Sequence, residues 1–112
     1  MSIELKKANE YEKTEQEKIP VEEKPAFHVA APVGWINDPN GFSWYQGQIH
    51  LFYQYHPYTT EWGPMHWGHS VSDDMIHWKN MPSVLAPDQE YDKRGCFSGS
   101  ATEKDEKHVL IY

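Results

Sequence analysis

The protein has 112 residues, the length of one domain or of part of one. Its 17 acidic and 10 basic residues give a net charge of −7 at pH 7 and form no basic cluster, so no nucleic-acid partner is expected. No apolar run approaches the ~20 residues of a membrane span, no secretory segment follows Met1, and the single Cys96 excludes an intrachain disulfide, so we predict a cytoplasmic protein without a membrane partner.

The first 24 residues differ from the rest, because they contain seven Glu and five Lys but no Gly. We expect a surface helix over residues 3–18, followed by a linker near Pro20. A helix this polar is too weak to fold alone and is expected to pack on its neighbour. The chain is therefore divided into a charged helical leader and linker at 1–24 and a second part at 25–112. The apolar stripe of the helix would consist of Ile3, Leu5, Ala8 and Tyr11.

A carboxylate stands in the middle of the heptapeptide Trp35–Gly41. Pro39 fixes its own backbone φ and favours an extended Asp38, and Asn40-Gly41 is a strong turn signal. We therefore expect Asp38 on a stiff, tightly turned loop, where it can act as a nucleophile, a general base or a metal ligand. Such turn dipeptides are common in loops without chemistry, so the heptapeptide alone does not decide its role.

Short strands are expected to follow this loop. A hairpin is predicted from Phe42–Tyr45 through a turn at Gln46-Gly47 to Gln48–Tyr55. In its second strand, four apolar residues from Ile49 to Tyr55 share one face, and Gln54 lies on the opposite face. The remaining expected strands are 65–72, 76–79, 97–102 and 108–112, with an irregular connection at 82–95 and a charged turn at 103–107.

This pattern predicts an all-β fold, with no helical periodicity after residue 25. Short strands separated by turns are typical of a sandwich, barrel or propeller. A four-stranded propeller blade takes about 40–45 residues in the best-known repeat, so residues 25–112 have the length of about two blades.

The seven histidines do not indicate a metal site. His66 and His69 would point to opposite faces of a strand, and no Cys or carboxylate completes a zinc-binding pattern around them. We therefore predict no metal and expect these histidines to make structural hydrogen bonds.

The heptapeptide Trp35–Gly41 resembles the nucleophile motif of glycoside hydrolase family 32, which contains invertase, sucrose-6-phosphate hydrolase, levanase and inulinase. Further segments resemble those of the family, in the same order and at similar spacing. They are Phe52–Pro57, Trp62-Gly63, Met65–Ser70 followed by Ser72-Asp73 and His77-Trp78, and Cys96–Ser100. The resemblance implies a five-bladed β-propeller, of which residues 25–112 would supply about two blades after a short polar helix.

The resemblance also implies a retaining β-fructofuranosidase without a cofactor, which hydrolyses the terminal β-D-fructofuranoside bond of sucrose or sucrose-6-phosphate. It makes Asp38 the nucleophile, and we expect the Asn37 side chain to stabilise its charged form by a hydrogen bond. The sugar-binding residues that it implies are Trp35, Asn37, Gln54, Trp62, Phe97 and Ser98. Gln54 and Trp62 are expected to bind fructose rather than to stabilise the core.

Retaining hydrolysis needs a second carboxyl group, about 5–5.5 Å from the first. In the family this acid/base is the Glu of a Glu-Cys motif, and a third carboxylate lies in an Arg-Asp-Pro motif. Neither motif occurs in these 112 residues. We therefore expect an N-terminal fragment that is inactive and poorly folded by itself. The alternatives are a non-catalytic sugar-binding propeller, a truncated inactive product, a fructan hydrolase or a fructosyltransferase.

Overall fold

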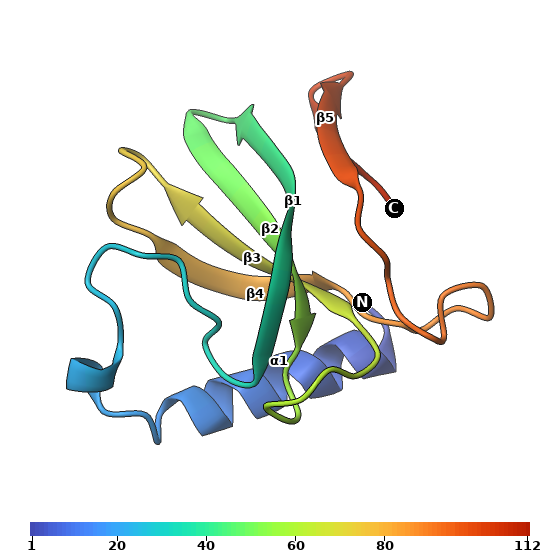
Figure 1. Ribbon diagram of the computed structural model, residues 1–112. Helices are drawn as coiled ribbons and strands as arrows, with labels where there is room; N and C mark the ends of the chain where they lie inside the picture. Colours follow the sequence, from blue (N-terminus) through green and yellow to red (C-terminus); the bar gives the residue numbers. More distant parts are fainter.

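The computed structural model describes residues 1–112 as a four-stranded antiparallel sheet, a two-stranded sheet and an N-terminal helix (Figure 1). This architecture confirms the predicted all-β class with a preceding polar helix. The four strands of the first sheet follow one another in space as in sequence, in the order β1-β2-β3-β4. The strands are β1 Trp35–Tyr45, β2 Gln48–His56, β3 His66–Ser72, β4 Lys79–Leu85, β5 Ser100–Lys104 and β6 Lys107–Ile111.

Strand β1 begins at Trp35, seven residues before the predicted start at Phe42. The expected loop is therefore wrong: the heptapeptide belongs to the strand. Its pairing with β2 is interrupted twice, between Ile36 and Pro39 and between Asn40 and Ser43. Gly41 has a φ of +52°, so the turn signal forms a bulge and does not reverse the chain. Pro39 is tolerated because β1 is an edge strand of the sheet.

The turn between β1 and β2 lies where it was predicted. Gln46 and Gly47 have φ values of 48° and 77°, as in a two-residue hairpin turn with both central residues at positive φ. The hairpin between β5 and β6 uses the same geometry at Asp105 and Glu106, with φ values of 50° and 61°. The charged turn predicted over residues 103–107 is therefore only two residues long.

Strand β4 lies at Lys79–Leu85, although a strand at 76–79 and an irregular connection at 82–95 were predicted. The Asp74 side chain explains why residues 76 and 77 are not extended. Its Oδ1 accepts hydrogen bonds from the backbone N–H groups of Ile76 and His77, both at 2.8 Å, which bends the chain. Pro82 is compatible with β4 because this strand forms the other edge of the sheet.

The two faces of β2 are both buried, by different parts of the chain. Tyr53 and Tyr55 lie on one face with Val33, and side chains of the helix and of the irregular segment before β1 pack over them. Phe52 lies on the other face with Trp67, and side chains of β5 and β6 pack over this pair. Burial of each such side chain stabilises the fold by about 1.5–3 kcal/mol. The predicted alternation along β2 is confirmed.

The helix α1, Ile3–Gln16, packs against β4. Ala8 and Glu12 of this helix are buried. The Asn9 side chain pairs with the backbone of Ser83, accepting from its N–H at 2.8 Å and donating to its carbonyl at 3.4 Å. An edge strand presents unpaired backbone groups, and the Asn9 amide supplies the partners that a fifth strand would otherwise supply.

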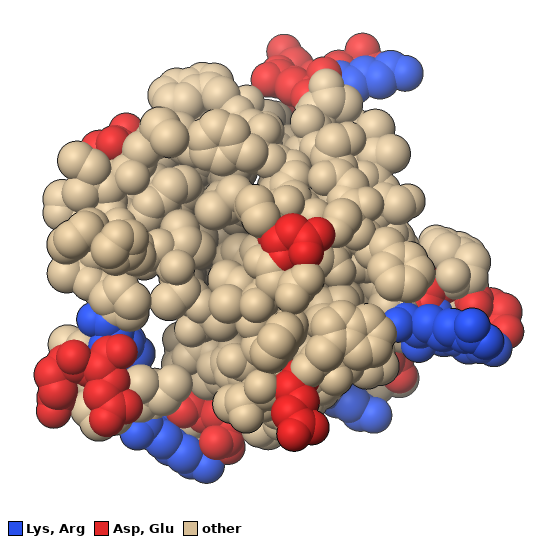
Figure 2. Space-filling view, viewed as in Figure 1, with Lys and Arg blue, Asp and Glu red and all other residues tan.

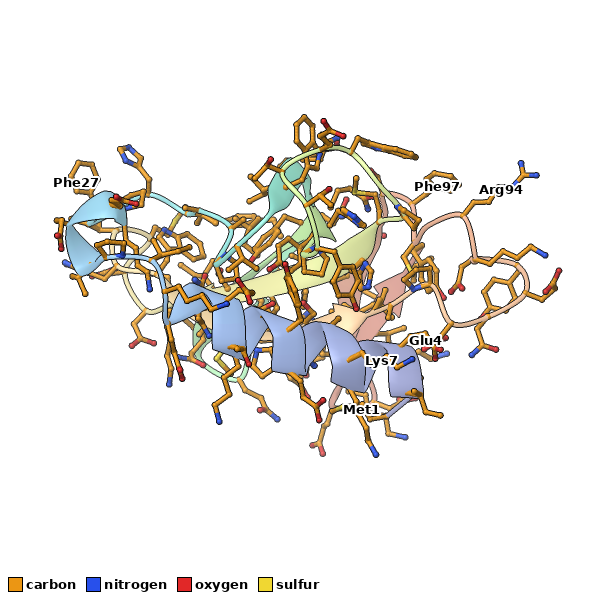
Figure 3. All side chains as sticks on the ribbon, turned by 90° about the horizontal axis from the view of Figure 1, so that it is seen from below. Met1, Glu4, Lys7, Phe27, Arg94 and Phe97 are labelled. Atoms are coloured by element: carbon orange, nitrogen blue, oxygen red, sulfur yellow. The ribbon has the colours of Figure 1, made fainter.

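The predicted stripe on the helix is wrong at Ile3, which is 65% exposed. Asn9 and Glu12 contact β4 through hydrogen bonds to Ser83, because the polar groups of an edge strand favour polar partners over aliphatic ones. A short 3₁₀ helix, Val21–Glu23, follows in the predicted linker. No helix in the protein has both the length and the apolar character needed to cross a membrane. Figure 3 shows α1 crossing the molecule, with Phe27 beyond one end of the helix and Glu4 and Lys7 at the other.

Candidate active site

The Asp38 carboxylate is exposed on β1, beside the first bulge of that strand. Its Oδ2 accepts a hydrogen bond from the Ser98 hydroxyl at 2.5 Å, and its Oδ1 accepts from the Asn37 amide, also at 2.5 Å. The Ser98 hydroxyl, a backbone N–H and the Asn37 amide lower the pKa of Asp38, because they stabilise its charged form. Asp38 is therefore ionised at neutral pH.

The Asn37 amide is itself oriented by a neighbour. The indole Nε1 of Trp35 donates to Asn37 Oδ1 at 3.1 Å. Because this bond identifies the oxygen end of the amide, the nitrogen end must face Asp38. The sequence predicted that Asn37 would stabilise the charged carboxylate, and the structure shows this contact. It also shows the orienting bond from Trp35.

Ser98 comes from a distant part of the chain, 60 residues from Asp38. It lies in the Cys96–Gly99 segment, which precedes β5 and is irregular, although it was predicted to be mostly strand. The backbone N–H of Gly41 donates to the Gly99 carbonyl at 3.3 Å, which attaches this segment to β1. Phe97 is 62% exposed beside Ser98, and Figure 3 places it near Arg94 at one margin of the molecule.

Gln54 lies below this surface and is only 3% exposed. Its Nε2 donates to the Cys96 carbonyl at 2.9 Å. The predicted face of the strand is correct, but that face is buried under the Cys96–Gly99 segment. Gln54 therefore belongs to the core, although we expected it not to stabilise the core. Direct contact between Gln54 and a sugar stays a prediction.

Trp62 lies in the loop between β2 and β3 and is 60% exposed. No hydrogen bond or ring contact joins it to Asp38 or to the residues around Asp38. The structure thus brings four of the predicted site residues into one hydrogen-bonded group and leaves the other three outside it. The group consists of Trp35, Asn37, Asp38 and Ser98.

Two residues that support this group were not identified from the sequence. Asn40 is 2% exposed, and with its amide oxygen facing Gln54 it accepts from Gln54 Nε2 at 3.0 Å. Trp67 is fully buried and donates from Nε1 to the Phe97 carbonyl at 3.0 Å. Asn40 was interpreted as a turn residue of the heptapeptide, and Trp67 lies in the Met65–Ser70 segment but was assigned no role.

The surface in Figure 2 is largely uncharged, with isolated acidic side chains on it and the basic side chains near its margin. No group of three or more His, Cys, Asp or Glu side chains is arranged to hold a metal ion. The chemistry that the surroundings of Asp38 offer is therefore that of an ionised carboxylate beside hydroxyl, amide and aromatic groups.

Residues 28–112 match the family model described as the Glycosyl hydrolases family 32 N-terminal domain. The chain belongs to glycoside hydrolase family 32. The sucrose-6-phosphate hydrolase of Escherichia coli is 58% identical over 88 residues, which cover 79% of this chain and 18% of that protein. The levanase of Bacillus subtilis is 53% identical over 100 residues, covering 80% of this chain and 14% of that protein.

Solved structures of family 32 share the fold. A β-fructofuranosidase from Bombyx mori superimposes with a TM-score of 0.84 at 45% identity, covering 96% of this chain and 22% of that one. A mutant of that enzyme, with an aspartate replaced by alanine, was solved in complex with sucrose and also gives a TM-score of 0.84, at 44% identity and with the same coverage. Sucrose-6-phosphate hydrolase from Lactobacillus gasseri gives 0.76 at 34% identity, covering 96% and 21%.

The chain spans about a seventh to a fifth of the length of these family 32 relatives. They are β-propeller enzymes, and the residues described here form part of such a propeller, as predicted. The predicted two blades correspond to one complete four-stranded sheet, β1 to β4, and to the β5–β6 hairpin. Asp38 lies on β1, and Ser98 lies on the connection between the two sheets.

Proposed function

We propose that the protein containing this chain is a retaining β-fructofuranosidase that hydrolyses the terminal β-D-fructofuranoside bond of sucrose or sucrose-6-phosphate. The observation that carries this proposal is the Asp38 carboxylate, which is exposed and held by the Ser98 hydroxyl and the Asn37 amide. A carboxylate kept ionised and fixed in direction is suited to nucleophilic attack on an anomeric carbon.

In the proposed reaction, one Asp38 oxygen attacks the anomeric carbon of fructose. The bond from this carbon to the glycosidic oxygen breaks, and the leaving oxygen takes a proton from a general acid. Water then attacks the fructosyl ester, the general base removes the proton of that water, and Asp38 returns to its ionised form. The acid/base belongs to a Glu-Cys motif in the family and is absent from the sequence of these 112 residues.

The sugar would be held by the groups around Asp38. Asn37 and Ser98 offer an amide and a hydroxyl beside the carboxylate, and exposed rings offer surfaces on which the apolar faces of sugars stack. The sugar-binding residues that we propose are Trp35, Asn37, Gln54, Trp62, Phe97 and Ser98. Among them Gln54 is buried, with only 3% of it exposed.

The choice of substrate class follows the relatives. Those described above are a levanase, two sucrose-6-phosphate hydrolases and a β-fructofuranosidase with a sucrose complex. A saccharide with a terminal fructose is common to sucrose, sucrose-6-phosphate and fructans. Sucrose and sucrose-6-phosphate are preferred here because the E. coli and L. gasseri relatives are sucrose-6-phosphate hydrolases and the B. mori mutant was solved with sucrose.

The test uses the full-length gene product with Asp38→Asn, which keeps the shape of the side chain and removes its charge. Fructose release from sucrose and sucrose-6-phosphate is expected to fall by roughly 10⁴-fold, as for other catalytic nucleophiles. The matched control is Asp73→Asn. Asp73 is also exposed, lies in the connection between β3 and β4, and accepts a side-chain hydrogen bond only from Gln48 of β2. Its rate should equal that of the wild type.

Other outcomes separate the remaining functions. Saccharide binding by the wild-type protein without any fructose release would identify a sugar-binding propeller in place of an enzyme. Faster release from levan or inulin than from sucrose would identify a fructan hydrolase. Accumulation of trisaccharides from sucrose would identify a fructosyltransferase. Near-normal turnover by Asp38→Asn, with native circular dichroism, would refute Asp38 as the nucleophile.

A further inference from the structure

The Cys96–Gly99 segment is irregular, yet hydrogen bonds to the first sheet and to Met65, just before β3, hold it at almost every residue. The backbone N–H of Cys96 donates to the Met65 carbonyl at 2.8 Å, and the Cys96 carbonyl accepts from Gln54 at 2.9 Å. The Gly99 carbonyl accepts from the Gly41 N–H at 3.3 Å. These bonds fix the two ends of the segment. Ser98 lies between them, so its position also depends on what holds the Phe97–Ser98 peptide.

Trp67 provides that contact. Its Nε1 donates to the Phe97 carbonyl at 3.0 Å, and its side chain is fully buried in a cluster with Phe52 and Cys96. The Phe97 carbonyl belongs to the peptide whose nitrogen is that of Ser98. Because a buried indole cannot move without repacking the cluster, this bond fixes the plane of that peptide.

The plane of this peptide determines where the Ser98 hydroxyl points. Rotation of the peptide would turn the Cα–Cβ bond of Ser98 and carry its Oγ away from Asp38 Oδ2, which now accepts from it at 2.5 Å. A hydrogen bond of this kind weakens steeply when its distance or angle changes. The chain of contacts therefore runs from the Trp67 indole through the Phe97 carbonyl and Ser98 to the Asp38 carboxylate.

We propose that Trp67 is a positioning residue for the nucleophile, and that its indole N–H holds Ser98 in the geometry that donates to Asp38. This inference rests on the proposed function of Asp38. Packing alone explains why the residue at position 67 is large and apolar, but Phe or Leu would meet this packing requirement equally well. Packing does not require an N–H directed at the carbonyl beside Ser98.

Loss of the indole N–H has a defined consequence at Asp38. The Phe97 carbonyl loses its partner, the Ser98 hydroxyl loses its fixed direction, and Asp38 loses a donor to its charged form. Since the Ser98 hydroxyl is the largest cause that lowers the pKa of Asp38, that pKa should rise. The acid limb of kcat/KM reports the ionisation of this carboxylate in the free enzyme and should move to higher pH.

The experiment measures kcat/KM for sucrose against pH in the full-length gene product and in Trp67→Phe, Ser98→Ala and the double variant. Trp67→Phe should move the acid limb in the same direction as Ser98→Ala and lower kcat/KM by about tenfold, the loss for one charge-assisted hydrogen bond. The double variant should match Ser98→Ala, because Trp67 acts through Ser98. If Trp67→Phe and Ser98→Ala shift the acid limb independently, so that the two shifts add in the double variant, the proposal is overturned.

Two further variants separate positioning from packing. Phe52→Leu removes ring packing from the same buried cluster without removing a donor, so it should lower the melting temperature and leave the acid limb in place. Site-specific replacement of Trp67 by β-(3-benzothienyl)alanine keeps the shape of the indole and substitutes sulfur for its N–H. It should reproduce the shift of the acid limb even if Trp67→Phe folds poorly, and an unshifted limb would contradict the proposal.

A crystal structure of the benzothienyl variant decides the point without an assay. The Ser98 Oγ is expected beyond hydrogen-bond distance of Asp38, and an unchanged contact would overturn the positioning role. If the wild-type protein releases no fructose, the proposed function fails, and this structure still shows whether Trp67 positions Ser98.

Discussion

Acidification should destabilise the fold through two histidines of β3, the buried His66 and the half-buried His69. Burial is the largest cause that lowers the pKa of each to about 4, from an ordinary value of 6.5. At His66 the neighbouring His56 adds to this effect, while a hydrogen bond to the Pro64 carbonyl opposes it. His66 is only 4% exposed, so it gives the cleaner test.

The direction of the effect follows from proton binding. Between pH 6.5 and about 4 an unfolded His66 binds a proton that the folded protein does not bind. The free energy of unfolding therefore has its full value above pH 6.5, falls as the pH falls through this window, and levels off below a pH of about 4. At a pH of about 4.5 one such histidine costs about 2–3 kcal/mol, a large part of the usual 5–15 kcal/mol.

The assay is urea unfolding of the full-length protein and of His66→Gln, followed by tryptophan fluorescence at a pH of about 7 and of about 4.5. Gln can still donate to the Pro64 carbonyl but does not titrate. The stability advantage of the wild type over His66→Gln should shrink by about 2–3 kcal/mol between the two pH values. His28→Gln is the control, because His28 is exposed. An advantage that is equal at both pH values would refute the reasoning.

Three further outcomes are expected. Gln54→Ala should lower the free energy of unfolding by about 1–3 kcal/mol in urea titrations, since it removes a buried donor from the Cys96 carbonyl; an unchanged value would contradict this. Trp62→Ala should change the free energy of unfolding by less than about 0.5 kcal/mol, because Trp62 is 60% exposed. It should also raise KM for sucrose, whereas unfolding with normal substrate binding would show a structural role. Gly41→Ala should cost about 1–3 kcal/mol more stability than Gly47→Ala in thermal unfolding. Both glycines have positive φ, but a Cβ at Gly41 would lie 2.9 Å from the Phe52 ring, whereas Gly47 has no neighbour within 4 Å. Equal costs would contradict this contact.

Several features of this protein were predicted from local sequence. The alternation along β2 and the turn at Gln46-Gly47 were correct because each depends on residues that are adjacent in the chain. Asn37 was also correctly expected to donate to Asp38, since neighbours in sequence remain neighbours in space. The motifs that carry the resemblance to family 32 are also short contiguous segments, so they can be identified from the sequence without the tertiary structure.

The edges of the sheet were decided by the tertiary structure. Pro39 and Pro82 suggested a loop and an irregular connection, but both residues lie in strands, because β1 and β4 are edge strands with one side free of pairing. Which strands form the edges depends on the order of all four strands, and no local pattern contains that order. The Asn9 side chain pairs with Ser83 across 74 residues for the same reason.

The site also depends on contacts that the sequence does not bring together. Ser98 reaches Asp38 across 60 residues, and Trp67 reaches Phe97 across 30. Both contacts require the Cys96–Gly99 segment to lie against the first sheet in one register. The sequence identified the carboxylate and its adjacent amide. Only the packing of the segment on the sheet supplies the hydroxyl and the indole that complete the surroundings of Asp38, because hydrogen bonds require positions within a few tenths of an ångström.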